Sequence, residues 1–191
     1  MLRITLFCVG NSNQAVAALR RIKTENLPAF NFVVSDGSDE SSVMSNILAG
    51  HHIPIKHNNV LRLEHAVNLA TKKGEEVFGK VLENYLPKPL RFYLDQEPDG
   101  DDFKMVDVGI EVGNELENLI PEEGDFHLLV IGHQLPIVAL AYSINLELSD
   151  CGERILDIEF QGGDGVTFEL DGFCLSCPES VDLLVGENGQ A

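Results

Sequence analysis

His133 is the residue of this sequence best placed to do chemistry. It follows an apolar run at 128–131 and a glycine, and it precedes a segment with helical composition. A histidine at the point where a buried strand turns into a helix can act as an acid or a base near neutral pH. It can equally serve as an ordinary polar residue that caps the helix. Both interpretations stay open from the sequence.

Cys8 is the second catalytic candidate, because it lies near the end of another apolar run, 2–9. If the two runs form neighbouring parallel strands, Cys8 and His133 end at the same edge of the sheet. A cysteine beside a histidine can form a thiolate nucleophile. A cysteine in an apolar run is more often a small, buried core residue. The sequence leaves a Cys–His nucleophile and a core thiol as alternatives.

The other cysteines and histidines do not predict a metal centre. Cys174 and Cys177 form one Cys-x-x-Cys pair, and the second pair that a zinc site needs is missing. His51, His52 and His57 flank a short strand without a carboxylate at ligand spacing. The sequence also has no Gly-x-Gly-x-x-Gly after its first strand and no Walker motif. We therefore expect no metal, no cofactor and reduced thiols.

The predicted elements that position these residues alternate between strands and helices. Strand patterns cover 2–9, 30–35, 53–56, 126–131, 154–160 and 166–170, with the last two joined as a hairpin through 161–165. Helical patterns cover 15–22, 38–49, 63–86, 103–120 and 135–146, and we expect Ser12 or Asn13 to cap the first of them and Ser38 the second. This order predicts an α/β fold, a three-layer sandwich around a mostly parallel central sheet with an antiparallel edge. We expect one domain over 1–191, with an acidic loop insertion at about 87–102 and a loose C-terminal tail at about 178–191.

The charge balance restricts the partners. Asp and Glu number 31 against 13 Lys and Arg, which gives a net charge of −18. Such a surface repels phosphate backbones and anionic lipid headgroups, so neither nucleic acid nor a membrane is an expected partner. The first apolar run is too short for a signal peptide, and no apolar stretch approaches the ~18 residues of a membrane helix. We expect a cytoplasmic protein that binds another protein or a small molecule, and a homo-oligomer stays open.

The layout along residues 2–171 resembles the histidine phosphatase superfamily, which has the phosphoglycerate-mutase-like fold. Residues 6–10 stand where that family has a strand leading into Arg-His-Gly, and residues 33–40 stand where a strand ends in Ser-Ser-Pro with an arginine three residues on. Residues 53–55 and 61–64 resemble the short strand and the Leu-x-x-Glu segment that follow. Residues 128–134 are similar to the late strand that leads into His-Gly and a helix. The resemblance implies the fold of that family.

At most of the positions where the family has its functional residues, this chain has a different residue. The resemblance puts the nucleophilic histidine on Val9, the arginine before it on Cys8 and the second arginine on Glu40. The late histidine is kept as His133, and the proton-donating acid corresponds at best to Glu64. Valine cannot accept a phosphoryl group, and a carboxylate ~4 Å from a phosphate oxygen repels it by about 4 kcal/mol at an effective dielectric near 20. The departures imply a pseudoenzyme.

Three hypotheses for the function follow from these residues. The first is a catalytically inactive histidine-phosphatase-like protein that binds a partner or a neutral or cationic ligand. The second is a hydrolase with altered chemistry that uses Cys8 and His133. The third is a generic Rossmann-like binding domain. The residues expected to line the pocket are Cys8, Val9, Gly10, Asn11, Ser35, Glu40, Glu64, His133 and Gln134.

Overall fold

A computed structural model gives the structure of most of the chain. It describes residues 1–49, 53–58, 61–62, 91, 105–121, 124–144, 155, 157, 159–170 and 178–185. The helix predicted at 63–86 and the Cys174/Cys177 pair lie outside the described residues, as does the acidic loop insertion at 87–102 apart from Arg91.

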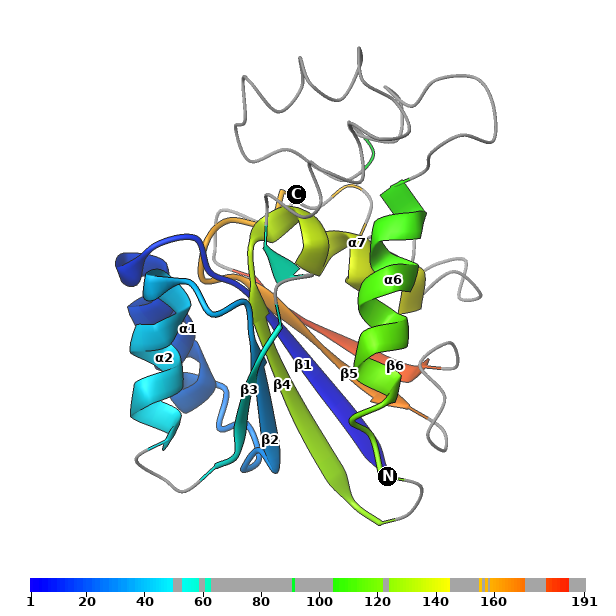
Figure 1. Ribbon diagram of the computed structural model, residues 1–191, viewed down its shortest axis with the longest axis horizontal. Coiled ribbons are helices and arrows are strands. Elements are labelled where there is room, and N and C mark those ends of the chain that lie inside the picture. The colour runs from blue at the N-terminus through cyan, green and yellow to red at the C-terminus, as the bar shows by residue number, and fades with distance from the viewer. Residues whose placement is uncertain are drawn as a thin grey trace.

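The described part of the chain is built around a six-stranded sheet with the order β3-β2-β4-β1-β5-β6 (Figure 1). The strands are β1 (Leu2–Cys8), β2 (Phe32–Ser35), β3 (Ile55–His57), β4 (Phe126–Gly132), β5 (Gly165–Leu170) and β6 (Pro178–Leu184). Strands β1 to β4 are parallel to one another, whereas β5 runs antiparallel to β1 and β6 antiparallel to β5. The predicted mostly parallel sheet with an antiparallel edge is confirmed.

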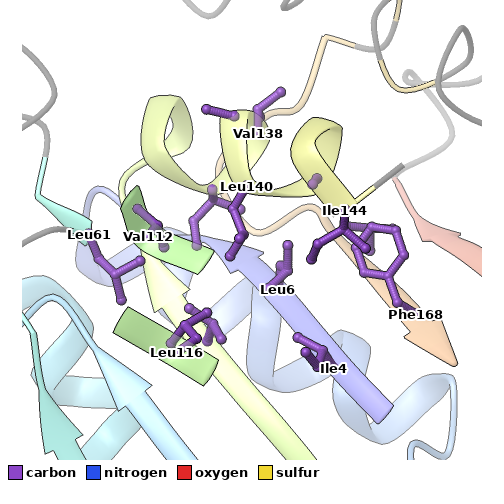
Figure 2. Packing of buried hydrophobic residues seen from close by; sticks show 14 of the residues in the cluster. Ile4, Leu6, Leu61, Val112, Leu116, Val138, Leu140, Ile144 and Phe168 are labelled. Carbon is purple, nitrogen blue, oxygen red and sulfur yellow. The ribbon is translucent and has the colours of Figure 1, made fainter. Parts of the chain in front are cut away.

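Two pairs of helices cover the two faces of this sheet. They are α1 (Ser12–Thr24) and α2 (Asp39–Ala49) on one face, and α6 (Met105–Glu117) and α7 (Gln134–Ile144) on the other (Figure 1). Side chains alternate across a strand, so Ile4 and Leu6 pack with α6 and α7, whereas Phe7 packs with α1 and α2. Figure 2 shows the first of these clusters, with Leu140 and Ile144 pointing from α7 toward Leu6. The three-layer sandwich is confirmed.

Local signals fix where the helices begin. Asn11 caps α1, because its side chain accepts a hydrogen bond of 3.0 Å from the backbone N–H of Gln14. The expected caps Ser12 and Asn13 are wrong, since both residues already lie inside the helix. Ser38 caps α2 as predicted, with its hydroxyl accepting from the N–H of Ser41 at 3.2 Å. Among the described helices, none combines the length and the apolarity needed to cross a bilayer.

The strand predicted at 154–160, and the hairpin built on it, are wrong. Ile155 and Asp157 are helical, and the guanidinium of Arg91 pairs with the carboxylate of Asp157 at 2.5 Å. The predicted hairpin needs a free edge of β5, but β5 pairs with β1 on one side and with β6 on the other. The segment at 154–160 therefore cannot pair with β5 as a hairpin partner.

The expectation of a loose tail from about residue 178 is wrong for the described residues there. Pro178–Leu184 form β6, whose outer edge tolerates the proline that lacks a backbone N–H. Val181 and Leu183 alternate with polar residues and pack against the cluster under α6 and α7. Burial of this alternating apolar face is what orders the segment.

Candidate functional site

The carboxyl ends of three parallel strands meet at one edge of the sheet. In the register of the sheet, Cys8 of β1 lies opposite Gly132 of β4, and Ser35 of β2 lies opposite Ile131. The expectation that Cys8 and His133 stand at the ends of neighbouring parallel strands is thereby confirmed. Gly10 lies beside His133, since a Cβ on this glycine would be 4.0 Å from the imidazole Cδ2. Ligands of open α/β sheets bind at such an edge.

A contact between a buried carboxylate and an imidazole forms the centre of this edge. Asp36 follows β2 directly, and its Oδ2 lies 2.8 Å from Nδ1 of His133. The Asp36 side chain is fully buried, whereas 23% of the His133 side chain is exposed. A carboxylate at one ring nitrogen fixes the orientation of an imidazole and favours the proton on that nitrogen. His133 therefore has its Nδ1 edge on Asp36 and its Nε2 edge turned away from it.

The start of α2 holds the other oxygen of Asp36. Oδ1 accepts hydrogen bonds from the backbone N–H of Ser38 at 2.9 Å, from the Ser38 hydroxyl at 2.8 Å and from the Ser41 hydroxyl at 2.5 Å. Burial raises the pKa of Asp36, but the hydrogen bonds from His133, Ser41 and Ser38 outweigh it and leave the pKa below its ordinary value. The carboxylate is thus ionised at neutral pH and acts as a fixed buried anion.

Arg62 brings a cation to the same edge. Its Nε donates to the carbonyl oxygen of Asp36 at 2.8 Å and its Nη2 to that of Gly37 at 3.4 Å. Asp36, Ser38, Ser41 and Arg62 were all missed as site residues by the sequence analysis. The available signal was position: Asp36 follows the strand end of β2, and Arg62 follows that of β3.

Cys8 and Val9 are parts of the two hydrophobic clusters. Cys8 is 1% exposed and packs on the α6/α7 side, and Val9 is fully buried on the α1/α2 side. Burial, together with the nearby carboxylate of Asp164, raises the pKa of the Cys8 thiol far above its ordinary value. Both residues are therefore core residues beneath the strand ends and do not line the surface of the site. Burial of Cys8 also disfavours its thiolate form.

The remaining predicted pocket residues have structural partners or lie outside the described residues. Asn11 caps α1, and the Ser35 hydroxyl lies 2.9 Å from that of Ser41. Gln134 donates to the carbonyl oxygen of Phe160 at 2.5 Å. Glu40 belongs to α2, but its side chain is not described, and Glu64 is outside the described residues.

Alkylation tests the state of Cys8. We expect iodoacetamide at pH 7–8 to modify Cys8 in the folded protein at least about a hundredfold more slowly than in urea, because each unit of raised pKa removes nine-tenths of the thiolate. Peptide mapping separates Cys8 from the other three cysteines of the chain. Fast labelling of Cys8 in the folded protein would restore the Cys–His nucleophile.

The arrangement offers no metal centre within the residues that the structure describes. No three histidine, cysteine, aspartate or glutamate side chains gather there as ligands, and His51 and His52 lie outside that part of the chain. What remains is an imidazole that a buried carboxylate holds in place beside Gly10. Such a group can accept a proton or a hydrogen bond from a bound molecule.

The fold is shared with phosphatases of known structure, although no protein-family model and no curated protein matches the chain. A mycobacterial glucosyl-3-phosphoglycerate phosphatase is 14% identical, with a TM-score of 0.54 over 95% of both chains. The alpha-ribazole phosphatase from Shigella flexneri is 10% identical, with a TM-score of 0.52 over 90% of this chain and 92% of that one. A phosphoserine phosphatase from Entamoeba histolytica is 11% identical, with a TM-score of 0.53 over 100% of this chain and 98% of that one. At these identities the likeness establishes the fold, and it is the phosphoglycerate-mutase-like fold that the sequence layout predicted.

Proposed function

We propose that this chain is a binding module on a histidine-phosphatase-like fold that does not transfer phosphoryl groups. It binds a small molecule or a protein group at the edge of the sheet where Asp36 and His133 meet. The observation that carries the proposal is the fully buried Val9 at the end of β1, where the resemblance places the nucleophilic histidine.

The residues at the end of β1 support the proposal that the chain does not transfer phosphoryl groups. That reaction needs an imidazole to receive the phosphoryl group and cationic donors to hold its oxygens. Val9 has no polar atom and packs in a hydrophobic cluster with Phe7, Ala15 and Met44. Cys8, which stands where the first arginine would be, is buried in the opposite cluster. Neither side chain can take over the missing role.

Electrostatics indicate the class of ligand. The fixed groups at the edge are the ionised Asp36, His133 paired with it, and Arg62 bound to backbone carbonyls. The whole chain carries a net charge of −18. Both the local carboxylate and the overall field disfavour phosphorylated ligands, nucleic acids and anionic surfaces. A neutral polar or cationic ligand fits this edge better.

A second candidate function is a hydrolase with altered chemistry, in which His133 acts as a general base. The 2.8 Å contact between Asp36 and His133 favours it, because a carboxylate that orients a histidine is a recurring arrangement in hydrolases. The nucleophile would then be water, since Cys8 is buried with a raised thiol pKa. Activity that depends on both Asp36 and His133 would distinguish this candidate from the binding module.

Hydrolysis of p-nitrophenyl phosphate from pH 4 to 8 tests the proposal. We expect no turnover above the buffer rate for the wild type, His133→Ala or the matched exposed control His57→Ala. Removing a nucleophile costs on the order of 10⁶ in rate in other hydrolases, so residual phosphoryl transfer would fall below detection.

Turnover by the wild type that survives in His57→Ala and disappears in His133→Ala would contradict the proposal. The same assay with p-nitrophenyl acetate tests the general-base candidate, whose electrophile need not be a phosphate. Ester hydrolysis lost in both His133→Ala and Asp36→Asn would favour that candidate over the binding module.

A further inference from the structure

We propose that Asp36 sets the ligand class of this site by acting as a built-in anion. Its carboxylate occupies the hydrogen-bond donors that would otherwise receive an anionic ligand. The inference rests on the proposed function, since both place ligand binding beside His133. It goes further in naming one residue as the determinant of specificity.

Donors from two separate parts of the fold converge on this carboxylate. The start of α2 gives the Ser38 N–H and the hydroxyls of Ser38 and Ser41, all to Oδ1 at 2.5–2.9 Å. The junction of β4 and α7 gives Nδ1 of His133, 2.8 Å from Oδ2. A helix N-terminus, two hydroxyls and an imidazole are the kinds of group that bind oxyanions in proteins. In this protein the carboxylate of Asp36 is the group that these donors meet.

The position of Asp36 in the sequence explains why it reaches these donors. Ser35 is the last residue of β2, and β2 pairs with β4 so that Ser35 lies opposite Ile131, two residues before His133. The backbone N–H of Asp36 still donates to the carbonyl oxygen of Ile131 at 3.0 Å. The side chain is therefore anchored at the strand end and fully buried. It could leave this position only by giving up the hydrogen bonds to Oδ1 and the contact of Oδ2 with His133.

A second anion at this position would meet both occupied donors and a fixed negative charge. Two unit charges 4 Å apart repel by about 4 kcal/mol at an effective dielectric of 20. Arg62 brings one positive charge to this edge, but its Nε and Nη2 donate to the carbonyls of Asp36 and Gly37 and are not available to an anion. Removing the carboxylate should free the donors and abolish the repulsion at once.

Formate binding to Asp36→Ala tests the inference, because formate has the size and charge of the group deleted. Isothermal titration with sodium formate, at ionic strength held constant with sodium chloride, gives the affinity. We expect Asp36→Ala to bind formate at least about tenfold more tightly than the wild type, a difference of 1.4 kcal/mol. Adding His133→Asn to this variant should reverse the gain. Asp39→Ala, which removes an exposed aspartate at the start of the same helix, should behave as the wild type does.

Asp36→Asn keeps the test decisive if Asp36→Ala does not fold. The amide preserves the shape of the side chain and removes its charge, so we expect inorganic phosphate to bind this variant about tenfold more tightly than the wild type. The inference is overturned if the folded variants gain no affinity for their anions, or if formate binds the wild type and Asp36→Ala equally. By contrast, phosphate binding by the wild type that is lost in His133→Asn would contradict the proposed function itself.

Discussion

We expect the free energy of unfolding of the wild type to decrease as the pH drops from 6.5 to 4. Replacing His127 with glutamine should make this decrease smaller. His127 is the second residue of β4 and only 5% exposed. Its Nε2 lies 2.9 Å from the Thr5 hydroxyl, which lies 2.9 Å from that of Thr167, and its ring contacts the ring of Phe30 at 4.4 Å between centroids. The imidazole is thus enclosed in its neutral form.

The direction of the effect follows from the pKa. Burial, and then the positive charge of Arg3 beside it, lower the pKa of His127 from 6.5 to about 4, against opposing contacts with the backbone of Pro28 and Ala29. Arg3 is itself paired with Glu169 across β1 and β5. Between pH 6.5 and 4 the unfolded chain binds a proton that the folded chain does not bind. The stability contributed by His127 is complete above pH 6.5 and is lost as the pH falls, by about 3 kcal/mol in total.

Urea unfolding at half-unit pH steps measures this loss. The difference between the slopes of the wild type and His127→Gln isolates His127, because every other titrating group is common to both proteins. His57→Gln is the matched control, since it removes an exposed histidine of β3. Equal slopes for the wild type and His127→Gln would show that His127 is protonated as easily in the folded protein as in the unfolded chain.

Local pattern and chain order were enough to predict the centre of the fold. The nearly continuous apolar run of β4 predicts a strand buried in the middle of a parallel sheet, and β4 lies between β2 and β1. The polar residues at the ends of such strands then predict where the site lies. The neighbourhood of Cys8 and His133 was expected only from the resemblance of the chain layout to a known family, and the pairing of β1 with β4 confirms it.

Contacts between distant segments could not be predicted in the same way. The pairing of Asp36 with His133 depends on β2 lying beside β4, and nothing near either residue in the sequence encodes that neighbourhood. The same limit explains the false strand at 154–160. Its alternating pattern satisfies the local rule, but the hairpin also needs a free edge of β5, and β6 occupies that edge. Which strand edges are free depends on how all the strands of the sheet pair, so a local pattern cannot reveal it.

Gly109 makes another contact between distant segments that local pattern does not predict. It lies in α6 where this helix crosses α7, and a Cβ at this position would stand 2.2 Å from the carbonyl oxygen of Ala139, 2.6 Å from its carbonyl carbon and 2.9 Å from Oγ of Ser143. The apolar period of α6 predicts its buried face, with Val108 and Val112 in the core. It does not reveal that a helix backbone presses against Gly109.

Gly109→Ala should therefore destabilise the protein, although alanine favours a helix over glycine by about 1 kcal/mol. The atoms in the way belong mostly to the α7 backbone, which must shift, and overpacking of this kind costs about 1–3 kcal/mol. Urea unfolding at pH 7 gives the change, and Ile110→Ala, at a 45% exposed position in the same helix, should cost far less. A gain in stability for Gly109→Ala would mean that the two helices have room to separate. Because α7 begins directly after His133, a shift of this helix should also weaken the contact of His133 with Asp36.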